Sequence, residues 1–321
     1  MKTRIGILSI VLSLMTITSY AQKTDTLAKK LDSLSNKTDS AGGQKNVTNP
    51  AAYTQKTQLT PKTYFILLGS DVKQAFTKPF HMKARDWKYL GAAAVVTGGL
   101  LFADKPVQQF ALRFRNDHPG LQNTSKYITN FGGLYELYTL SAFGAYGFIF
   151  KNEKMKNTTL LASQAYITGA AVQSVMKLLS GRTRPSSYDP NTIAQPTFKG
   201  PFSKVSTNYG GGKTTSSFPS GHTTVAFAAA TVFAMEYKNR PWIPIFAYSA
   251  ASLIGLSRIT ENKHWTTDVV VGAALGYLTG RQVVNNYHRY AELKAPKQQK
   301  SLSVNLQYNF GHIMPGLVYK F

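Results

Sequence analysis

The chain has no cysteine among its 321 residues and few acidic side chains. The lack of cysteine excludes a disulfide framework and any chemistry that needs a thiol. Asp and Glu together number 14, and no histidine–carboxylate cluster has the spacing of metal ligands, so the sequence indicates no metal site. The central part of the chain also lacks internal repeats and the alternating pattern of β-strands. These absences favour a helical protein that works without a bound metal.

Basic residues greatly outnumber acidic ones. Lys and Arg number 37, which gives a formal net charge of +23. This charge favours anionic partners, such as a phosphorylated substrate or an anionic membrane surface. Nucleic acid fits less well, because the basic residues are spread along the chain and no nucleic-acid-binding signature is present. We therefore expect no nucleic acid partner, and the sequence does not indicate an oligomeric state.

The N-terminal part has the composition of an export signal followed by a tether. Residues 1–21 combine a basic start, an apolar run over 5–15 and a small-residue cleavage site, which is typical of a secretory signal. An uncleaved anchor helix is the alternative. Residues 22–60 are rich in Ser, Thr, Lys, Asn and Gln and predict a disordered leader. The protein is thus expected beyond the inner membrane of a bacterium.

Residues 61–290 are predicted to form one helical domain. Six segments rich in Ala, Gly, Leu and aromatic residues are separated by polar links that contain Pro or Gly. They cover residues 89–103, 137–150, 157–176, 222–235, 241–257 and 269–280. Residues 61–86 predict further helices lying across this domain or on a membrane surface. The predicted fold class is all-α, a bundle of about six helices.

The tail of the chain has a different pattern. After a linker at 291–300, apolar and polar residues alternate from Leu302 to Phe310, which predicts a β-strand. Residues 311–316 can turn the chain into a second strand that ends at Phe321. A terminal Phe on an alternating strand resembles the ending of outer-membrane barrel proteins, but two strands cannot close a barrel in lipid. We interpret residues 301–321 as a small β-hairpin that covers part of the bundle.

Three short motifs lie at the ends of the predicted helices. They are Lys177 with Arg184-Pro185, then Pro219-Ser220-Gly221-His222, then Ser257-Arg258 with His264 and Asp268. The first ends the third helix, the second starts the fourth, and the third joins the fifth to the sixth. An up-and-down bundle brings those ends to one face. The start of the fourth helix also predicts an anion site, because Ser220 suits an N-cap and Gly221 lets a ligand approach the backbone.

The three motifs together resemble the signature of the type 2 phosphatidic acid phosphatase and vanadium haloperoxidase superfamily. Every signature position is present, in order and at family spacing, over about residues 177–268. The resemblance implies a helical phosphatase that uses no metal and no cofactor. Vanadate would bind in such a site as a mimic of phosphate.

The chemistry of phosphate esters explains the basic and small residues of these motifs. Phosphate oxygens are negative, so a catalyst must neutralise them before a nucleophile can approach. Lys177, Arg184 and Arg258 can supply the positive charge, and the guanidinium groups offer paired donors. The Ser220 hydroxyl and the Gly221 backbone N–H add neutral donors. We expect these five residues to bind phosphate, as the resemblance also implies.

The two motif histidines are the candidates for bond making and breaking. His264 is expected to attack phosphorus and form a phosphohistidine, while Asp268, at i+4, fixes its tautomer. His222 is expected to act as general acid on the leaving alkoxide. Arg182 and Lys263 lie inside the motifs but outside the signature. We interpret them as accessory or surface charges.

The expected function is hydrolysis of phosphate monoesters or diphosphates of envelope lipids. Phosphatidic acid, a polyprenyl diphosphate and the phosphates of lipid A are candidate substrates. A soluble periplasmic acid phosphatase of broad specificity, a vanadate-dependent haloperoxidase and a non-enzymatic envelope tether are the alternatives. The long link over 186–218 is expected to lie over the site as a lid that helps to select the leaving group.

Membrane topology stays open at the level of sequence. The segment 157–176 is long enough to span but contains Gln164 and Gln173, and the other apolar segments are shorter. If all six segments crossed after export, the site would face the cytoplasm. The basic loop at 151–156, which lies at the opposite end, has the composition of a cytoplasmic loop. We expect a membrane-associated protein that acts on the periplasmic side, at the inner or the outer membrane.

Overall fold

A computed structural model describes residues 59–189, 193–201, 203, 215–294, 301–309 and 312–320. The predicted signal and nearly all of the predicted leader lie outside these residues. Within the described residues the chain forms nine α-helices, two short 3-10 helices and one β-hairpin. The predicted all-α fold class is therefore confirmed.

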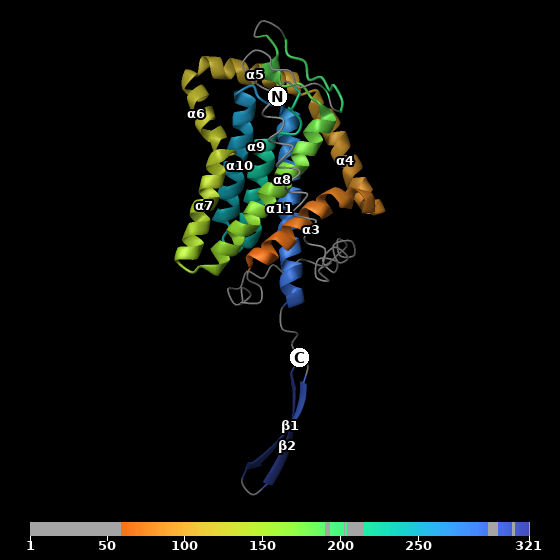
Figure 1. The fold of residues 1–321 in the computed structure, drawn as a ribbon, viewed down its shortest axis with the longest axis vertical. Helices are drawn as coiled ribbons and strands as arrows, with labels where there is room; N and C mark the ends of the chain where they lie inside the picture. The colour runs from red at the N-terminus through yellow and green to blue at the C-terminus, as the bar shows by residue number, and fades with distance from the viewer. Residues whose placement is uncertain are drawn as a thin grey trace.

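Five long helices form the bundle (Figure 1). They are α7 (Leu134–Ile149), α8 (Glu153–Ser180), α9 (Gly221–Glu236), α10 (Trp242–Thr260) and α11 (Thr266–Lys294). Helix α9 is the central one, since it packs against α8, α10 and α11. Its buried Ala228 and Val232 meet Leu161 of α8 and Val283 of α11 in the main apolar cluster. The bundle is thus centred on the helix that begins with the second motif.

Small residues allow α11 to approach α9 closely. Gly272, Gly276 and Gly280 recur every fourth residue and so lie on one face of α11. A Cβ at Gly276 would lie 2.3 Å from the carbonyl oxygen of Thr224, and one at Gly280 would lie 2.5 Å from that of Ala228. Neither distance leaves room for a side chain. The separation of the two helices is therefore set by these glycines.

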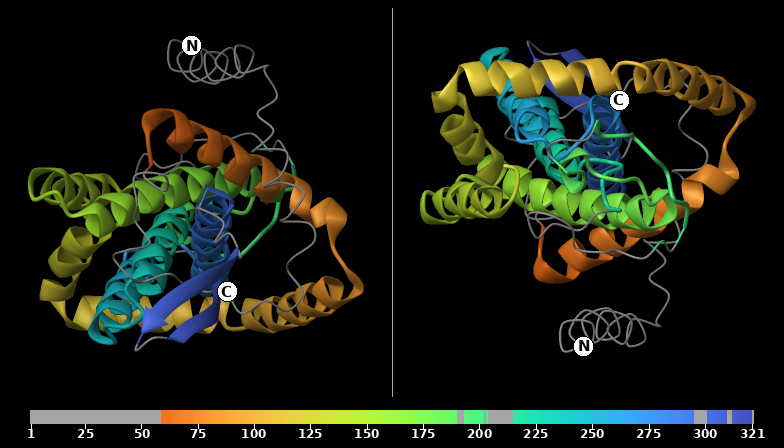
Figure 2. Two further views of the ribbon diagram at one scale, coloured as in Figure 1. Left: turned by 90° about the horizontal axis from the view of Figure 1, so that it is seen from below. Right: turned by 90° about the horizontal axis from the view of Figure 1, so that it is seen from above.

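Four further α-helices surround the bundle (Figure 2). They are α3 (Pro61–Thr77), α4 (Ala84–Leu101), α5 (Asp104–Asp117) and α6 (Pro119–Asn130). The 3-10 helix η2 (Lys78–His81) follows α3, so residues 61–86 contain helices as expected. In Figure 1, α5 lies across the end of the bundle where α9 and α11 begin.

Helices α5 and α6 are additions to the six predicted segments. The stretch Asp104-Lys105-Pro106 directly follows the predicted segment 89–103 and is one of the polar links with Pro expected between helices, but α5 begins at Asp104. Pro106 is the third residue of that helix. Because the N–H groups of the first turn have no partner within a helix, the missing N–H of proline is tolerated there. The separator is in fact a helix start.

Large apolar side chains remain exposed on the outer helices. They include Val95 and Val96 of α4, Phe148 and Ile149 of α7, and Ile245 and Phe246 of α10. By length and composition α10 could cross a membrane, and α4 and α5 pass the same test only if they are taken together across a bend of 51°. A surface with this many exposed apolar side chains favours an apolar environment around the bundle.

The C-terminal residues form the predicted hairpin. Strands β1 (Ser301–Asn309) and β2 (His312–Lys320) pair antiparallel, with Asn309 opposite His312. The second strand begins earlier than predicted and includes Pro315, since both strands of a two-stranded sheet are edges and an edge tolerates proline. The hairpin lies beyond the end of α11, not over the bundle (Figure 1). The reason is the length of α11, whose 29 residues span about 43 Å.

Candidate active site

The three motifs meet at one end of the bundle. Lys177 lies in the last turn of α8, His222 in the first turn of α9, Arg258 in the last turn of α10 and Asp268 in the first turn of α11. The links between these helices carry Arg184 and His264. The four helix ends thus bring residues almost a hundred positions apart into one site.

Helix α8 ends at a glycine in the left-handed backbone conformation, where the chain turns into the link that follows. Gly181 has a φ of +56°, and its N–H donates to the carbonyl of Lys177 at 3.1 Å. Glycine adopts this conformation without steric cost, which is why it ends many helices. A Cβ here would also lie 2.3 Å from the carbonyl oxygen of Gly200. The chain turns at this residue, and Arg182 and Arg184 follow in the link after α8.

The start of α9 is uncapped and lies beside a cation. Ser220 is the N-cap, but its hydroxyl bonds the Thr223 hydroxyl at 2.8 Å and caps no backbone N–H. Its own backbone N–H donates to the carbonyl of Asp268 at 2.9 Å. A Cβ at Gly221 would lie 3.0 Å from Lys177 Nζ. The helix start therefore keeps uncapped N–H groups beside an ammonium group, an arrangement suited to an anion.

The two arginines of the motifs are held by neighbouring side chains. Arg184 donates from Nε to the Ser216 hydroxyl at 3.2 Å, and burial, with help from Arg258, lowers its pKa to about 10. Arg258 donates from one Nη to Glu261 at 2.9 Å and to the Thr129 hydroxyl at 3.2 Å. Its Nε has no hydrogen-bond partner among the described residues. That N–H is free to serve a bound ligand.

Both imidazoles are held neutral by their surroundings. Burial lowers the pKa of His222 to about 3, and Arg258, Lys177 and Arg184 add to the effect. Burial also lowers the pKa of His264 well below its ordinary value, followed by Arg184, Arg258 and Lys177. The same three cations act on both histidines because all five groups lie close together. A neutral His264 is a competent nucleophile.

His264 and Asp268 are neighbours, at the spacing that the sequence predicts. The distance from His264 Nδ1 to Asp268 Oδ2 is 3.5 Å, and Nδ1 makes no hydrogen bond within the described part of the chain. Asp268 Oδ2 accepts hydrogen bonds from the Ser217 hydroxyl at 2.5 Å and from the backbone N–H of Trp265 at 2.9 Å. With Nδ1 facing the carboxylate, Nε2 is left on the opposite side of the ring.

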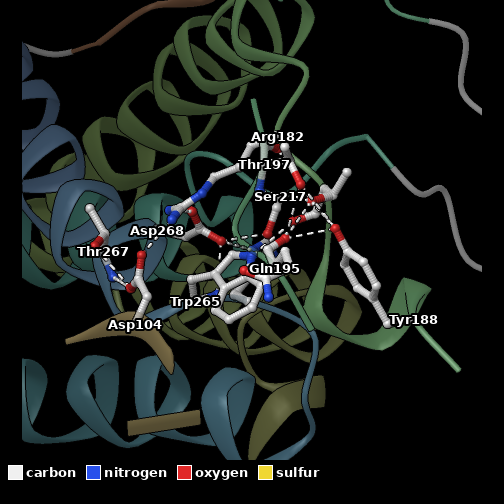
Figure 3. A network of polar contacts seen from close by, with 11 residues as sticks. Asp104, Arg182, Tyr188, Gln195, Thr197, Ser217, Trp265, Thr267 and Asp268 are labelled. Atoms are coloured by element: carbon white, nitrogen blue, oxygen red, sulfur yellow. Dashed lines mark hydrogen bonds and ion pairs between the residues drawn. The ribbon is translucent and has the colours of Figure 1, made fainter. Parts of the chain in front are cut away.

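The interpretation of Arg182 as a surface charge is wrong, while a role as an accessory charge stays a prediction. The side chain is fully buried and joins two carboxylates, donating to Asp268 Oδ1 at 2.6 Å and to Asp104 Oδ2 of α5 (Figure 3). Its guanidinium also lies over the ring of Phe198, 4.7 Å from the centroid. Sequence reasoning missed Asp104 altogether, because it lies 78 residues from Arg182 and within a predicted separator. The only available signal was that a buried guanidinium needs acidic partners.

Part of the long link after the first motif is described, and that part lies against the site. Phe198 forms an isolated backbone bridge with Arg182. Tyr188 donates to the carbonyl of Gln195 at 2.7 Å. Figure 3 shows the Tyr188 side chain with its hydroxyl directed towards Gln195 and Thr197. The lid function expected for residues 186–218 stays a prediction, because residues 190–192, 202 and 204–214 lie outside the described part.

Comparison with known proteins gives matches centred on the motif region. Residues 158–291 match the family model described as the PAP2 superfamily. A stretch of 70 residues is 51% identical to the lipid A 1-phosphatase of Porphyromonas gingivalis, covering 22% of this chain and 16% of that protein. A stretch of 73 residues is 37% identical to a probable diacylglycerol pyrophosphate phosphatase 1 of Schizosaccharomyces pombe, covering 19% and 26% respectively. The chain thus matches only about a sixth and a quarter of these relatives' lengths.

Two solved structures also resemble the chain. The crystal structure of LpxE from Aquifex aeolicus is 24% identical, with a TM-score of 0.40, over 56% of this chain and 94% of that one. The crystal structure of a transmembrane PAP2-type phosphatidylglycerolphosphate phosphatase from Bacillus subtilis is 22% identical, with a TM-score of 0.44, over 66% and 96%. The assignment itself rests on the family model, whose matched residues contain all three motifs. The resemblance of this chain to the type 2 phosphatidic acid phosphatase superfamily is therefore confirmed over residues 158–291.

Proposed function

We propose that the protein is a metal-independent phosphatase that hydrolyses a lipid phosphate through a phosphohistidine intermediate. One observation carries the proposal: His222, His264 and three cations lie together where four helix ends meet, with the uncapped start of α9 beside them. Positive charge and N–H donors are what a phosphoryl group requires, and a neutral imidazole among them can attack phosphorus. All of these groups come from the motif residues.

In the first step, Nε2 of His264 attacks phosphorus and the bond from phosphorus to the ester oxygen breaks. Lys177, Arg184 and Arg258 offset the charge on the other oxygens. His222 gives its proton to the leaving alkoxide, which departs as an alcohol. Asp268, at 3.5 Å from Nδ1, stabilises the positive charge that His264 gains.

In the second step, water attacks phosphorus, His222 accepts a proton from it, and the bond from phosphorus to His264 breaks. His222 must be protonated to begin the cycle, although its pKa is about 3 in the free protein. A bound phosphate dianion supplies negative charge beside the same cations that lower this pKa. Binding therefore raises the pKa of His222 and prepares the acid only when substrate is present.

Two features support a lipid as the substrate. The curated relatives are named as phosphatases of lipid A and of diacylglycerol pyrophosphate. The outer helices of this chain also expose large apolar side chains, which suits a protein at a membrane where lipids are available. We place the protein in the bacterial envelope, with its site on the periplasmic side.

The test is phosphate release from a panel of substrates. The panel contains phosphatidic acid, a polyprenyl diphosphate, lipid A and a small soluble ester, each assayed with and without a chelator. Wild type should act best on one of the lipids and should be unaffected by the chelator. His264→Ala should lose activity by about a thousandfold or more, because the nucleophile is gone. Lys263→Ala, at the neighbouring position, is the matched control and should stay within about twofold of wild type.

Each alternative has its own outcome in the same experiment. Release of phosphate from none of the esters would favour a non-enzymatic tether. A preference for the soluble ester without detergent would favour a soluble acid phosphatase. Halide oxidation that appears only with added vanadate and peroxide would favour a haloperoxidase. Equal activity of His264→Ala and wild type would remove the proposed nucleophile.

A further inference from the structure

A chain of buried charges lies behind the proposed nucleophile. It runs from Asp104 of α5 through Arg182 to Asp268 of α11 (Figure 3). Asp268 in turn lies 3.5 Å from His264 Nδ1. Both acidic side chains and the guanidinium are 0% exposed. The set has one more negative than positive charge. It therefore differs from an isolated ion pair, in which the two charges cancel.

Several contacts hold each residue of this set in place. Asp104 Oδ1 accepts from the backbone N–H and the hydroxyl of Thr267, both at 2.9 Å, while its Oδ2 accepts from Arg182. The guanidinium is enclosed by aromatic rings, of which Phe198 and Trp265 lie 4.7 and 5.8 Å from it. A buried charge without such partners would be very costly. The pairing therefore holds Asp268 in a single orientation.

We propose that Arg182 and Asp104 are positioning residues for the reaction, which act by holding the Asp268 carboxylate against His264. This inference rests on the proposed function and deepens it. Neither residue touches the reacting atoms. Asp104 belongs to α5 and lies before residues 158–291, so the reaction depends on a helix outside the segment that matches the family model.

Charge makes the two residues act in opposite directions on Asp268. Burial raises the pKa of this carboxyl, and Arg182 is the first of the groups that lower it again. Loss of Arg182 therefore favours a protonated Asp268, which can no longer stabilise a charged His264. Loss of the Asp104 charge leaves Arg182 to Asp268 alone and does not favour protonation. The other charged or titratable groups that face Asp268 are Arg184 and His264.

The experiment compares the pH dependence of kcat for wild type, Arg182→Met, Arg182→Lys and Asp104→Asn. In Arg182→Met the acid limb should move to higher pH by about one unit or more. Arg182→Lys keeps a charge but cannot bridge both carboxylates, so its limb should move less. In Asp104→Asn the limb should stay or move to lower pH, while kcat falls roughly tenfold because Arg182 has lost an anchor. Arg113→Met makes the same chemical change at an exposed site of α5 and should match wild type.

Folding is separated from positioning by normalising to the folded protein. Arg182→Lys and Asp104→Asn are the conservative variants and keep the measurement possible if Arg182→Met does not fold. A purely structural role would lower the melting temperature of both without moving the acid limb of either. That result would overturn the inference, and the proposed function would stand as long as wild type releases phosphate and His264→Ala does not.

Binding of vanadate gives a readout that needs no turnover. Calorimetric titration of the same variants should show weaker binding to Arg182→Lys than to wild type, most strongly at low pH. If wild type hydrolyses none of the esters, but vanadate still binds more weakly to Arg182→Lys than to wild type, the proposed function fails and the positioning role survives. Equal vanadate affinity of all four proteins at every pH would refute the positioning role.

Discussion

The cations around His264 can be changed one at a time, because Lys177 lies in α8, Arg184 in the link that follows it and Arg258 in α10. Arg184 is the first of the charged groups that add to the effect of burial on the pKa of His264. In the free protein these effects keep His264 neutral down to low pH. Arg184 therefore has two roles in the proposed reaction: it binds phosphate, and it keeps the nucleophile deprotonated.

Arg184→Gln should separate these roles from those of the other cations. Removal of the charge raises the pKa of His264 towards its ordinary value, so His264 becomes protonated at a higher pH. The acid limb of kcat/KM, which reports the free enzyme, should move to higher pH. The maximal kcat/KM should fall by about 10²–10³, the effect of removing one donor from a transition-state site.

Arg184→Lys is the control for charge. It keeps the positive charge but lacks the planar pair of donors, so its kcat/KM should fall while its acid limb stays with that of wild type. A pH profile with the same limb in both variants would contradict the proposed effect of Arg184 on His264.

At the scale of single residues, local patterns identify the motif side chains but not the buried residues that hold them in place. The motif residues lie at the ends of predictable helices, and their types follow from phosphate chemistry. Arg182 and Arg184 stand in the same short stretch, yet one is buried between carboxylates and the other belongs to the cation cluster. The partners of Arg182 lie 78 and 86 residues away. The signature distinguishes Arg184, which precedes Pro185, but nothing in the stretch predicts that Arg182 is buried.

At the scale of elements, the contact between α9 and α11 determines where the site residues stand. Helix α9 begins with Gly221-His222, and α11 carries Asp268 in its first turn. The glycines of α11 set the distance between these helices. A change in that distance would move both ends of the site.

Gly276→Ala tests this contact. The new Cβ would meet the carbonyl oxygen of Thr224 at 2.3 Å, and a backbone atom cannot move aside without moving α9. We expect a loss of about 1–3 kcal/mol in the free energy of unfolding and a lower kcat. Thermal unfolding in detergent and phosphate release are the measurements.

Gly98→Ala is the matched control, since a Cβ at this position of α4 has no heavy atom within 4 Å. This change should leave the melting temperature unchanged or raise it slightly, because alanine favours helices by up to about 1 kcal/mol. If both variants melted alike, the glycine contact would not determine the helix separation.

The prediction of elements succeeded where apolar runs were long and failed where a helix begins with polar residues. The segment 157–176 lies inside α8, which continues to Ser180. Helix α5 was missed because Asp104 and Pro106 are common both in links and in the first turn of helices. The same ambiguity hid Asp104 as a partner of the site.

At the scale of the whole molecule, apolar surface and positive charge both favour a membrane, but they differ in their response to salt. Attraction of basic residues to anionic lipid is strongly screened at 1 M salt, where the Debye length is about 3 Å. Burial of exposed side chains such as Phe148 and Phe246 in lipid is not screened.

Extraction of the native membrane fraction distinguishes the two forces. We expect the protein to stay with the membrane in 1 M salt and to be released by mild detergent. Immunoblotting of the soluble and membrane fractions is the measurement. Release by salt alone would show that charge, and not the apolar surface, holds the protein to the membrane.

The spread of the site over the chain has a consequence for biosynthesis. Asp104 leaves the ribosome well before His264 does. Until the link between α10 and α11 has been made, the growing protein lacks the group that attacks. Under the proposed roles, an unfinished copy that ends within α10 would not react with the lipids that it meets.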